Sequence, residues 1–251
     1  MSQAEESPSR GGGAALVADP IGELARRRFG VAAVRPWQRF VMAGILDGVA
    51  DGERRSARMV VLPTGAGKSL CFQAPALLGA APTLVVYPLL ALVNDQARRL
   101  AAAGVECAVL RGGLSPEERE AAFRAVETGK APVILSNPEM LAVPAVLDRL
   151  SRAGIRHVAV DEAHCVAEWG DSFRPAYLEL GNSLRSIAPA MLTAFTATAS
   201  PPVLARVAEL LFGPGRPRPA SRAARTSPIG WNPAYRSSAR SSASRGSGRG
   251  P

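Results

Sequence analysis

The sequence contains few lysines, few aromatic residues and few cysteines. Only Lys68 and Lys130 stand beside 28 arginines, a bias typical of gene base composition, and aromatic residues make up 5% of the chain. A lysine that is retained against this background is a candidate for a specific role. Cys71, Cys107 and Cys165 form no C-x-x-C pair. Their spacing argues against a zinc site or a disulfide framework, and it fits a reducing compartment.

The sequence also lacks an apolar leader and an uninterrupted membrane helix. The first thirteen residues, MSQAEESPSRGGG, have no apolar run and do not resemble a secretion signal. Residues 74–93 carry no charge, so a membrane helix is one interpretation of them. Pro75, Pro82 and Pro88 favour another interpretation, because prolines at this density break a helix. We expect a helix end, a buried strand and the start of a second helix, with no membrane association.

Acidic residues are missing from the last part of the chain. The net charge is +9, and residues 213–251 contain eight arginines without any aspartate or glutamate. The preceding residues, 1–212, therefore carry a net charge of only +1. The basic character belongs mainly to the tail. Residues 1–15 and 213–251 offer little to bury and are expected to be disordered.

Residues 20–212 alternate short apolar runs with longer helical patterns and are expected to form one domain. The helical patterns include residues 89–103, 116–127 and 201–212. Strands that alternate with helices predict an α/β fold in which helices cover both faces of a parallel sheet, with right-handed crossovers. The predicted strands are Met59–Leu62, Thr83–Tyr87, Cys107–Leu110, Val133–Ser136, His157–Val160 and Leu192–Phe195.

The segment PTGAGKS at residues 63–69 predicts a phosphate-binding loop between a strand and a helix. Glycines let backbone N–H groups crowd around a phosphate, and the helix start adds a positive dipole end. Lys68 supplies a charge for the β- and γ-phosphates, and Ser69 supplies a hydroxyl ligand for Mg²⁺. Leu62 replaces the first glycine of the full pattern, so a glycine turn with an exposed lysine is the alternative. The predicted nucleotide-binding residues of the loop are Thr64, Gly65, Ala66, Gly67, Lys68 and Ser69.

Two carboxylates, Asp161 and Glu162, directly follow the predicted strand His157–Val160. Ligands of open parallel sheets bind beyond the carboxyl ends of the strands, so this pair and the phosphate loop can share one edge. Asp161 can then bind Mg²⁺, and Glu162 can polarise the attacking water. The alternative is a surface pair at a helix start, where acids favour the dipole. The upstream Lys68 favours the first interpretation, and Lys68, Asp161 and Glu162 are the predicted catalytic residues.

The segment that begins with the acidic pair resembles a known family. DEAH at residues 161–164, followed by CVAEWGDSFRP at 165–175, is similar to the RecQ-type DNA helicases of helicase superfamily two. The resemblance implies a RecA-like P-loop domain, ATP and Mg²⁺ as cofactors, and DNA, single-stranded or at a junction with duplex, as the partner. Other segments match in the family's order: adenine recognition at 29–38, the phosphate loop at 63–75, DNA contacts at 85–96 and 136–141, and FTATA at 195–199.

The resemblance also implies roles for single residues. Arg35 and Gln38 would recognise adenine. The residues that would couple the γ-phosphate site to DNA or sense single-stranded DNA are His164, Trp169, Phe173, Arg174, Thr196 and Thr198. Stacking on aromatic rings suits bases of any identity, although ordinary packing is the alternative for Trp169 and Phe173. Val31, in place of an aromatic residue, and Glu168, in place of a glutamine, depart from the family's pattern.

The leading functional prediction is an ATP-dependent 3′→5′ DNA helicase of RecQ type, present as its first motor lobe and located in the cytoplasm near the nucleoid. We expect the second RecA-like lobe to be missing, because only 39 residues follow Phe212, without strand–helix alternation. A truncated chain of this kind would bind ATP weakly and would not translocate. One alternative is a non-catalytic nucleic-acid-binding module with a vestigial ATPase lobe and a basic tail. A P-loop ATPase that acts on proteins or small molecules is another.

Overall fold

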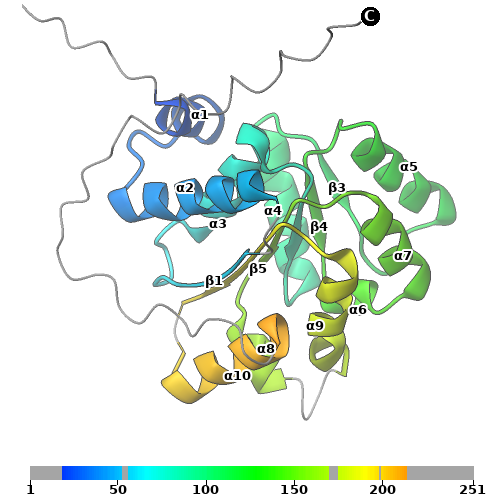
Figure 1. The fold of residues 1–251 in the computed structure, drawn as a ribbon. Helices are drawn as coiled ribbons and strands as arrows, with labels where there is room; N and C mark the ends of the chain where they lie inside the picture. Colours follow the sequence, from blue (N-terminus) through cyan, green and yellow to red (C-terminus); the bar gives the residue numbers. More distant parts are fainter. Residues whose placement is uncertain (1–18, 53–55, 170–174, 198, 214–251) are drawn as a thin grey trace, which may run out of the picture. The chain divides into compact units, whose positions relative to one another are not determined.

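The structure is a computed structural model that describes residues 19–52, 56–169, 175–197 and 199–213. Residues 1–15 and 214–251, which were predicted to be disordered, lie outside the described residues. A six-stranded sheet with the order β1-β6-β5-β2-β4-β3 organises the fold, and every strand pair is parallel (Figure 1). The strands are β1 (Ser56–Val61), β2 (Thr83–Val86), β3 (Cys107–Val109), β4 (Val133–Ser136), β5 (His157–Val160) and β6 (Met191–Thr196).

The parallel sheet predicted from the sequence is confirmed, with small differences at the strand ends. β1 begins at Ser56, three residues before the predicted start, because it pairs with β6 from Ser56–Met191 to Val61–Thr196. Tyr87 and Leu110 follow β2 and β3 rather than ending them. Their backbone N–H groups still donate to neighbouring strands, at 2.9 Å in each case. The apolar runs identified the strands, but the backbone hydrogen bonds between neighbouring strands determine where each strand begins and ends.

Helices cover both faces of the sheet, as predicted. Side chains of one strand alternate between two apolar clusters: Leu84 and Val86 of β2 face one, and Val85 and the following Tyr87 face the other. On the face of Val85 lie α1 (Pro20–Phe29), α2 (Pro36–Asp51), α3 (Lys68–Pro75), η1 (Ala76–Ala80) and α4 (Leu90–Ala102). On the opposite face lie α5 (Pro116–Glu127), α6 (Pro138–Leu141), α7 (Pro144–Arg152), α8 (His164–Trp169), α9 (Pro175–Ile187) and α10 (Pro201–Phe212).

The charge-free stretch at residues 74–93 contains the end of α3, then η1, β2 and the start of α4. This arrangement confirms the interpretation as a helix end, a buried strand and a new helix. None of the helices in the described parts of the chain combines the length and apolarity needed to cross a membrane.

Candidate nucleotide-binding site

The predicted phosphate loop connects β1 to α3. Gly65 and Gly67 both have left-handed backbone angles, with φ of 76° and 79°, which glycine adopts without a steric penalty. No side chain caps the first turn of α3, which begins at Lys68. The N–H groups at the start of a helix are donors without partners in the helix, and they attract anions. Lys68 is 8% exposed, so its amine is held within the site instead of extending into solvent.

Gln38, at the start of α2, supports the loop from behind. Its Nε2 donates to the carbonyl oxygens of Ala66 and Gly67, at 3.2 and 3.4 Å, and its Oε1 accepts from the N–H of Arg35 at 2.9 Å. A Cβ atom at Gly67 would lie 2.8 Å from this Nε2, so a larger residue would displace the Gln38 amide, and the left-handed φ of 79° itself favours glycine. Gln38 therefore fixes the loop backbone, while adenine recognition by Gln38 and Arg35 stays a prediction.

The acidic pair lies at the same edge of the sheet as the loop. Asp161 and Glu162 follow β5, and β6 alone separates β5 from β1. The Nζ of Lys68 is 2.7 Å from the Oε1 of Glu162, which joins residues 94 positions apart. Glu162 has φ of 46°, an unfavourable angle for a residue with a side chain, and such angles concentrate at functional sites. The structure thus brings the predicted lysine and glutamate into direct contact.

Asp161 is a buried carboxylate beside this ion pair. Its Oδ1 accepts a hydrogen bond from the N–H of Glu162 at 3.0 Å. Burial, and next the negative charge of Glu162, raise the pKa of Asp161 to about 6, while Lys68 acts in the opposite direction. A carboxylate that carries its charge at such a cost gains from a nearby cation. Its position therefore suits a metal-binding role.

The end of β6 lies between the strand that leads to the phosphate loop and the segment that carries the acidic pair. His164 Nδ1 lies 3.0 Å from Thr196 Oγ1 and 3.5 Å from Glu162 Oε2. On the other side, the backbone N–H of Leu62 donates to the carbonyl oxygen of Thr196 at 2.9 Å. Thr196 is thus in contact with both the strand that leads to the loop and the histidine after the acidic pair. The structure thus brings together His164 and Thr196, two of the six residues predicted to act in coupling or DNA sensing, and their coupling role stays a prediction.

Several predicted residues cannot be placed. Phe173, Arg174 and Thr198 lie outside the described residues, and Trp169 ends α8 without a description of its side chain. Arg35 is exposed just before α2. The proposed sensing of DNA by the segment 169–174 therefore stays a prediction.

A cleft of about 460 Å³ opens beside Ser69. Two buried glutamines that line it were not predicted as site residues from the sequence. Gln73 of α3 and Gln96 of α4 line it, and they are 5% and 8% exposed. Each glutamine lies in a segment that resembles a family motif, but their pairing depends on how α3 and α4 pack. The other residues that line the cleft are Arg28, Phe29, Val31, Leu70, Arg99, Ala102 and Ala103.

Comparisons with known proteins agree with this geometry. The family described as DEAD/DEAH box helicase matches residues 35–207. The chain is 44% identical over 174 residues to the ATP-dependent DNA helicase Q5 of Mus musculus, covering 67% of this chain and 17% of that protein. It is 44% identical over 147 residues to the ATP-dependent DNA helicase RecQ of Synechocystis sp., covering 56% and 31%. These relatives confirm the RecQ resemblance, and the chain spans less than a third of their length.

A solved structure shows the same fold. The Pyrococcus furiosus Hef helicase domain superposes with a TM-score of 0.56 at 24% identity, covering 74% of this chain and 37% of that one. At this identity the likeness concerns the fold alone. It confirms the predicted RecA-like helicase fold.

Proposed function

Because the chain belongs to the DEAD/DEAH box helicase family, we propose that its described domain binds ATP and Mg²⁺ as the first motor lobe of a RecQ-type, 3′→5′ DNA helicase. The contact between Lys68 and Glu162, at 2.7 Å, is the observation that carries the proposal. It supports the proposal because Lys68 would bind phosphate and Glu162 would activate water, and because the N–H groups of the first turn of α3 have no side-chain cap.

Lys68 and Glu162 would have different roles at the γ-phosphate. A bound γ-phosphate competes with Glu162 for Lys68, since both are anions. Once Lys68 has moved to the phosphate, the Glu162 carboxylate is available to orient and polarise the attacking water. The phosphate oxygens would lie against the N–H groups of the loop and of the first turn of α3.

Asp161 and Ser69 are the residues that would hold Mg²⁺. Mg²⁺ prefers carboxylate and hydroxyl oxygens together with substrate phosphates, and the buried carboxylate of Asp161 fits this preference because a cation offsets its unfavourable charge. When bound, Mg²⁺ would neutralise charge on the β- and γ-phosphates.

DNA is the proposed partner, at the segments 85–96 and 136–141. Both segments begin in strands, β2 and β4, that are neighbours in the sheet, and both continue past the strand ends. Their loops therefore emerge at the edge that also carries the nucleotide site. The relatives named as ATP-dependent DNA helicases are spanned to less than a third of their length by this chain, so unwinding is part of the proposal.

The ATP site is tested by substituting Lys68 and Glu162, with Lys130 as a control. We expect Lys68→Ala to weaken the binding of a fluorescent ATP analogue at least tenfold, because a charge at the phosphates is lost. Glu162→Gln should bind the analogue at least as tightly as the wild type, since Lys68 loses its competing partner, and should abolish DNA-stimulated hydrolysis. Binding is measured by titration, so this part does not depend on turnover.

Lys130 provides the matched control. Its side chain is 68% exposed and lies 3.6 Å from Glu106, away from the loop. Lys130→Ala should leave analogue binding unchanged. Wild-type affinity in the Lys68→Ala variant would show that the loop does not bind phosphates and would refute the proposed function.

A further inference from the structure

The helix that follows the phosphate loop is joined to the helix that follows a proposed DNA-contact strand. Gln73 lies in α3, five residues after Lys68, and Gln96 lies in α4. The Nε2 of Gln73 donates to the Oε1 of Gln96 at 2.9 Å, and both side chains are more than nine-tenths buried. Over the parts of the chain that the structure describes, this is the one side-chain hydrogen bond between α3 and α4.

The surroundings make this hydrogen bond important. Both glutamines are buried in helices whose apolar side chains, including Phe72, Val93 and Leu100, belong to one buried cluster. An amide that loses its partner in such a place stays desolvated, which is unfavourable. The pair also borders the cleft of about 460 Å³, where apolar packing between the helices is interrupted. The hydrogen bond therefore maintains the spacing of α3 and α4 at this point.

The N-terminus of each helix lies at a proposed binding site, for the nucleotide in α3 and for DNA in α4. α3 begins at Lys68, whose partner would change from Glu162 to phosphate when a nucleotide binds. α4 begins at Leu90 within the proposed DNA-contact segment, and Leu89 and Leu90 are 40% and 42% exposed although both are large and apolar. A short helix moves as a unit, so a shift at either end reaches the glutamine on its second turn.

We infer that Gln73 and Gln96 are positioning residues that couple nucleotide binding at the phosphate loop to DNA binding at the start of α4. This inference rests on the proposed function, because it assumes that ATP and DNA both bind to this domain. Coupling of this kind is reciprocal: the nucleotide changes DNA affinity by the same factor by which DNA changes nucleotide affinity.

The experiment measures this factor in the full chain. The affinity for fluorescein-labelled oligo(dT) is determined by anisotropy, with and without a saturating non-hydrolysable ATP analogue and Mg²⁺. We expect the two dissociation constants of the wild type to differ at least fivefold, within the usual range of coupling. In Gln73→Met, Gln96→Met and the double variant, which keep the side-chain length and remove the hydrogen bond, the ratio should fall below twofold. The double variant should be no worse than either single variant, because the pair acts as a unit.

A purely structural role predicts a different result. It would lower thermal stability and weaken both affinities, but it would leave their ratio unchanged. Ser183→Ala is the matched control, since Ser183 Oγ donates to the carbonyl of Leu141 at 3.3 Å and joins buried helices on the other face of the sheet. It should keep the wild-type ratio. Where a methionine variant fails to fold, Gln96→Asn keeps an amide but shortens its reach, and it should also reduce the ratio below twofold.

The outcomes separate the inference from the function on which it rests. A wild type that binds neither the analogue nor oligo(dT) refutes the proposed function. A wild type that binds both with a ratio near one, or variants that keep the wild-type ratio, overturn the coupling role and leave the proposed function intact.

Discussion

His157 is a buried, titratable side chain outside the nucleotide site. It lies at the start of β5 with no exposed surface, and its Nε2 is 2.8 Å from Thr193 Oγ1 of the neighbouring β6. Its Nδ1 is buried without a hydrogen-bond partner in the described structure. Burial lowers the pKa of His157 to about 3, so the folded protein holds the ring neutral. In the unfolded chain the ring takes up a proton near its ordinary pKa of about 6.5.

The stability of the fold should therefore decrease as the pH falls below 6.5. Between about pH 6.5 and 3 the unfolded chain binds one more proton than the folded one at His157, which costs about 1.4 kcal/mol per pH unit. We expect the advantage of the wild type over His157→Gln in unfolding free energy to shrink by about 2 kcal/mol between pH 7 and pH 5. Urea denaturation at the two pH values measures the difference.

The comparison with the variant is needed because the protonation of Asp161 changes the stability with pH in the opposite direction. Its raised pKa, about 6, means that the folded protein binds the proton more readily, so this contribution to stability is lost as the pH rises from 3.8 to about 6. Both proteins contain Asp161, and their difference isolates His157. Parallel pH profiles for wild type and His157→Gln would contradict the prediction.

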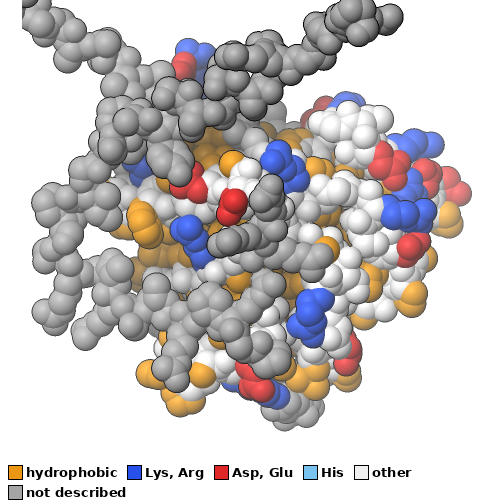
Figure 2. Space-filling view, viewed as in Figure 1, with side chains coloured by type: hydrophobic (Ala, Val, Ile, Leu, Met, Phe, Trp, Pro, Cys, Tyr) orange, Lys and Arg blue, Asp and Glu red, His pale blue; other side chains and the backbone are white. Residues whose placement is uncertain are grey.

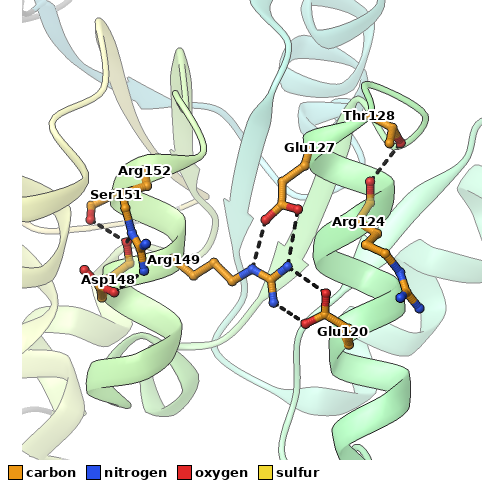
Figure 3. A network of polar contacts seen from close by, with 8 residues as sticks. All are labelled: Glu120, Arg124, Glu127, Thr128, Asp148, Arg149, Ser151 and Arg152. Atoms are coloured by element: carbon orange, nitrogen blue, oxygen red, sulfur yellow. Dashed lines mark hydrogen bonds and ion pairs between the residues drawn. The ribbon is translucent and has the colours of Figure 1, made fainter.

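At the scale of elements, an arginine joins two helices on one face of the sheet. Figure 2 shows basic and acidic side chains mixed over α5 and α7 rather than a field of one sign. Within this surface Arg149 of α7 reaches across to Glu120 and Glu127 of α5 (Figure 3), with its Nε 2.9 Å from Glu127 Oε1 and its Nη2 3.0 Å from Glu120 Oε1. Its guanidinium carbon also lies 4.4 Å from the centre of the Phe123 ring.

Arg149 should contribute more to stability than an ordinary surface arginine. Its guanidinium pairs with two carboxylates and contacts a ring, so Arg149→Met should lower the melting temperature measurably, by a few degrees. Arg149→Lys should recover only part of the loss, because an ammonium cannot pair with both carboxylates in this geometry. Thermal unfolding followed by circular dichroism measures these changes.

Arg152 is the matched control on the same helix. It pairs with Asp148 one turn away, and its side chain is 72% exposed. Arg152→Met should change the unfolding free energy by less than about 0.5 kcal/mol, as is usual for exposed pairs within a helix. Equal effects of Arg149→Met and Arg152→Met would show that the bridge between α5 and α7 has no special role.

At the scale of the whole molecule, charge is concentrated in residues 213–251, which hold eight arginines and no acidic residue. Each cation that neutralises a phosphate of single-stranded DNA contributes about 0.7 to the slope of log affinity against log salt. We expect removal of residues 213–251 to weaken oligo(dT) binding and to make this slope shallower. The binding that remains should still respond to the ATP analogue, because it belongs to the domain.

The same experiment tests the alternative of a non-catalytic nucleic-acid-binding module. In that case DNA binding would disappear on removal of the tail and would be unaffected by Lys68→Ala. Anisotropy titrations at several salt concentrations, with the full chain, the shortened chain and Lys68→Ala, distinguish the two functions.

Local sequence patterns predicted the six strands, several of the helices and the chemical groups of the site. Apolar runs at residues 83–86, 133–136 and 157–160 indicated strands buried on both faces, which predicted a parallel sheet between two layers of helices. The sequence also predicted the phosphate loop and the acidic pair after β5. Both could be recognised because backbone conformation and charge are local properties of the residues.

Packing between segments that are distant in the sequence set the rest of the site. No local pattern could show that β6 enters between β1 and β5, that Gln38 supports the phosphate loop, or that Lys68 pairs with Glu162. The hydrogen bond between Gln73 and Gln96 is of the same kind. Sequence patterns report what each segment prefers to bury, whereas contacts such as these arise only when separate elements pack on one sheet.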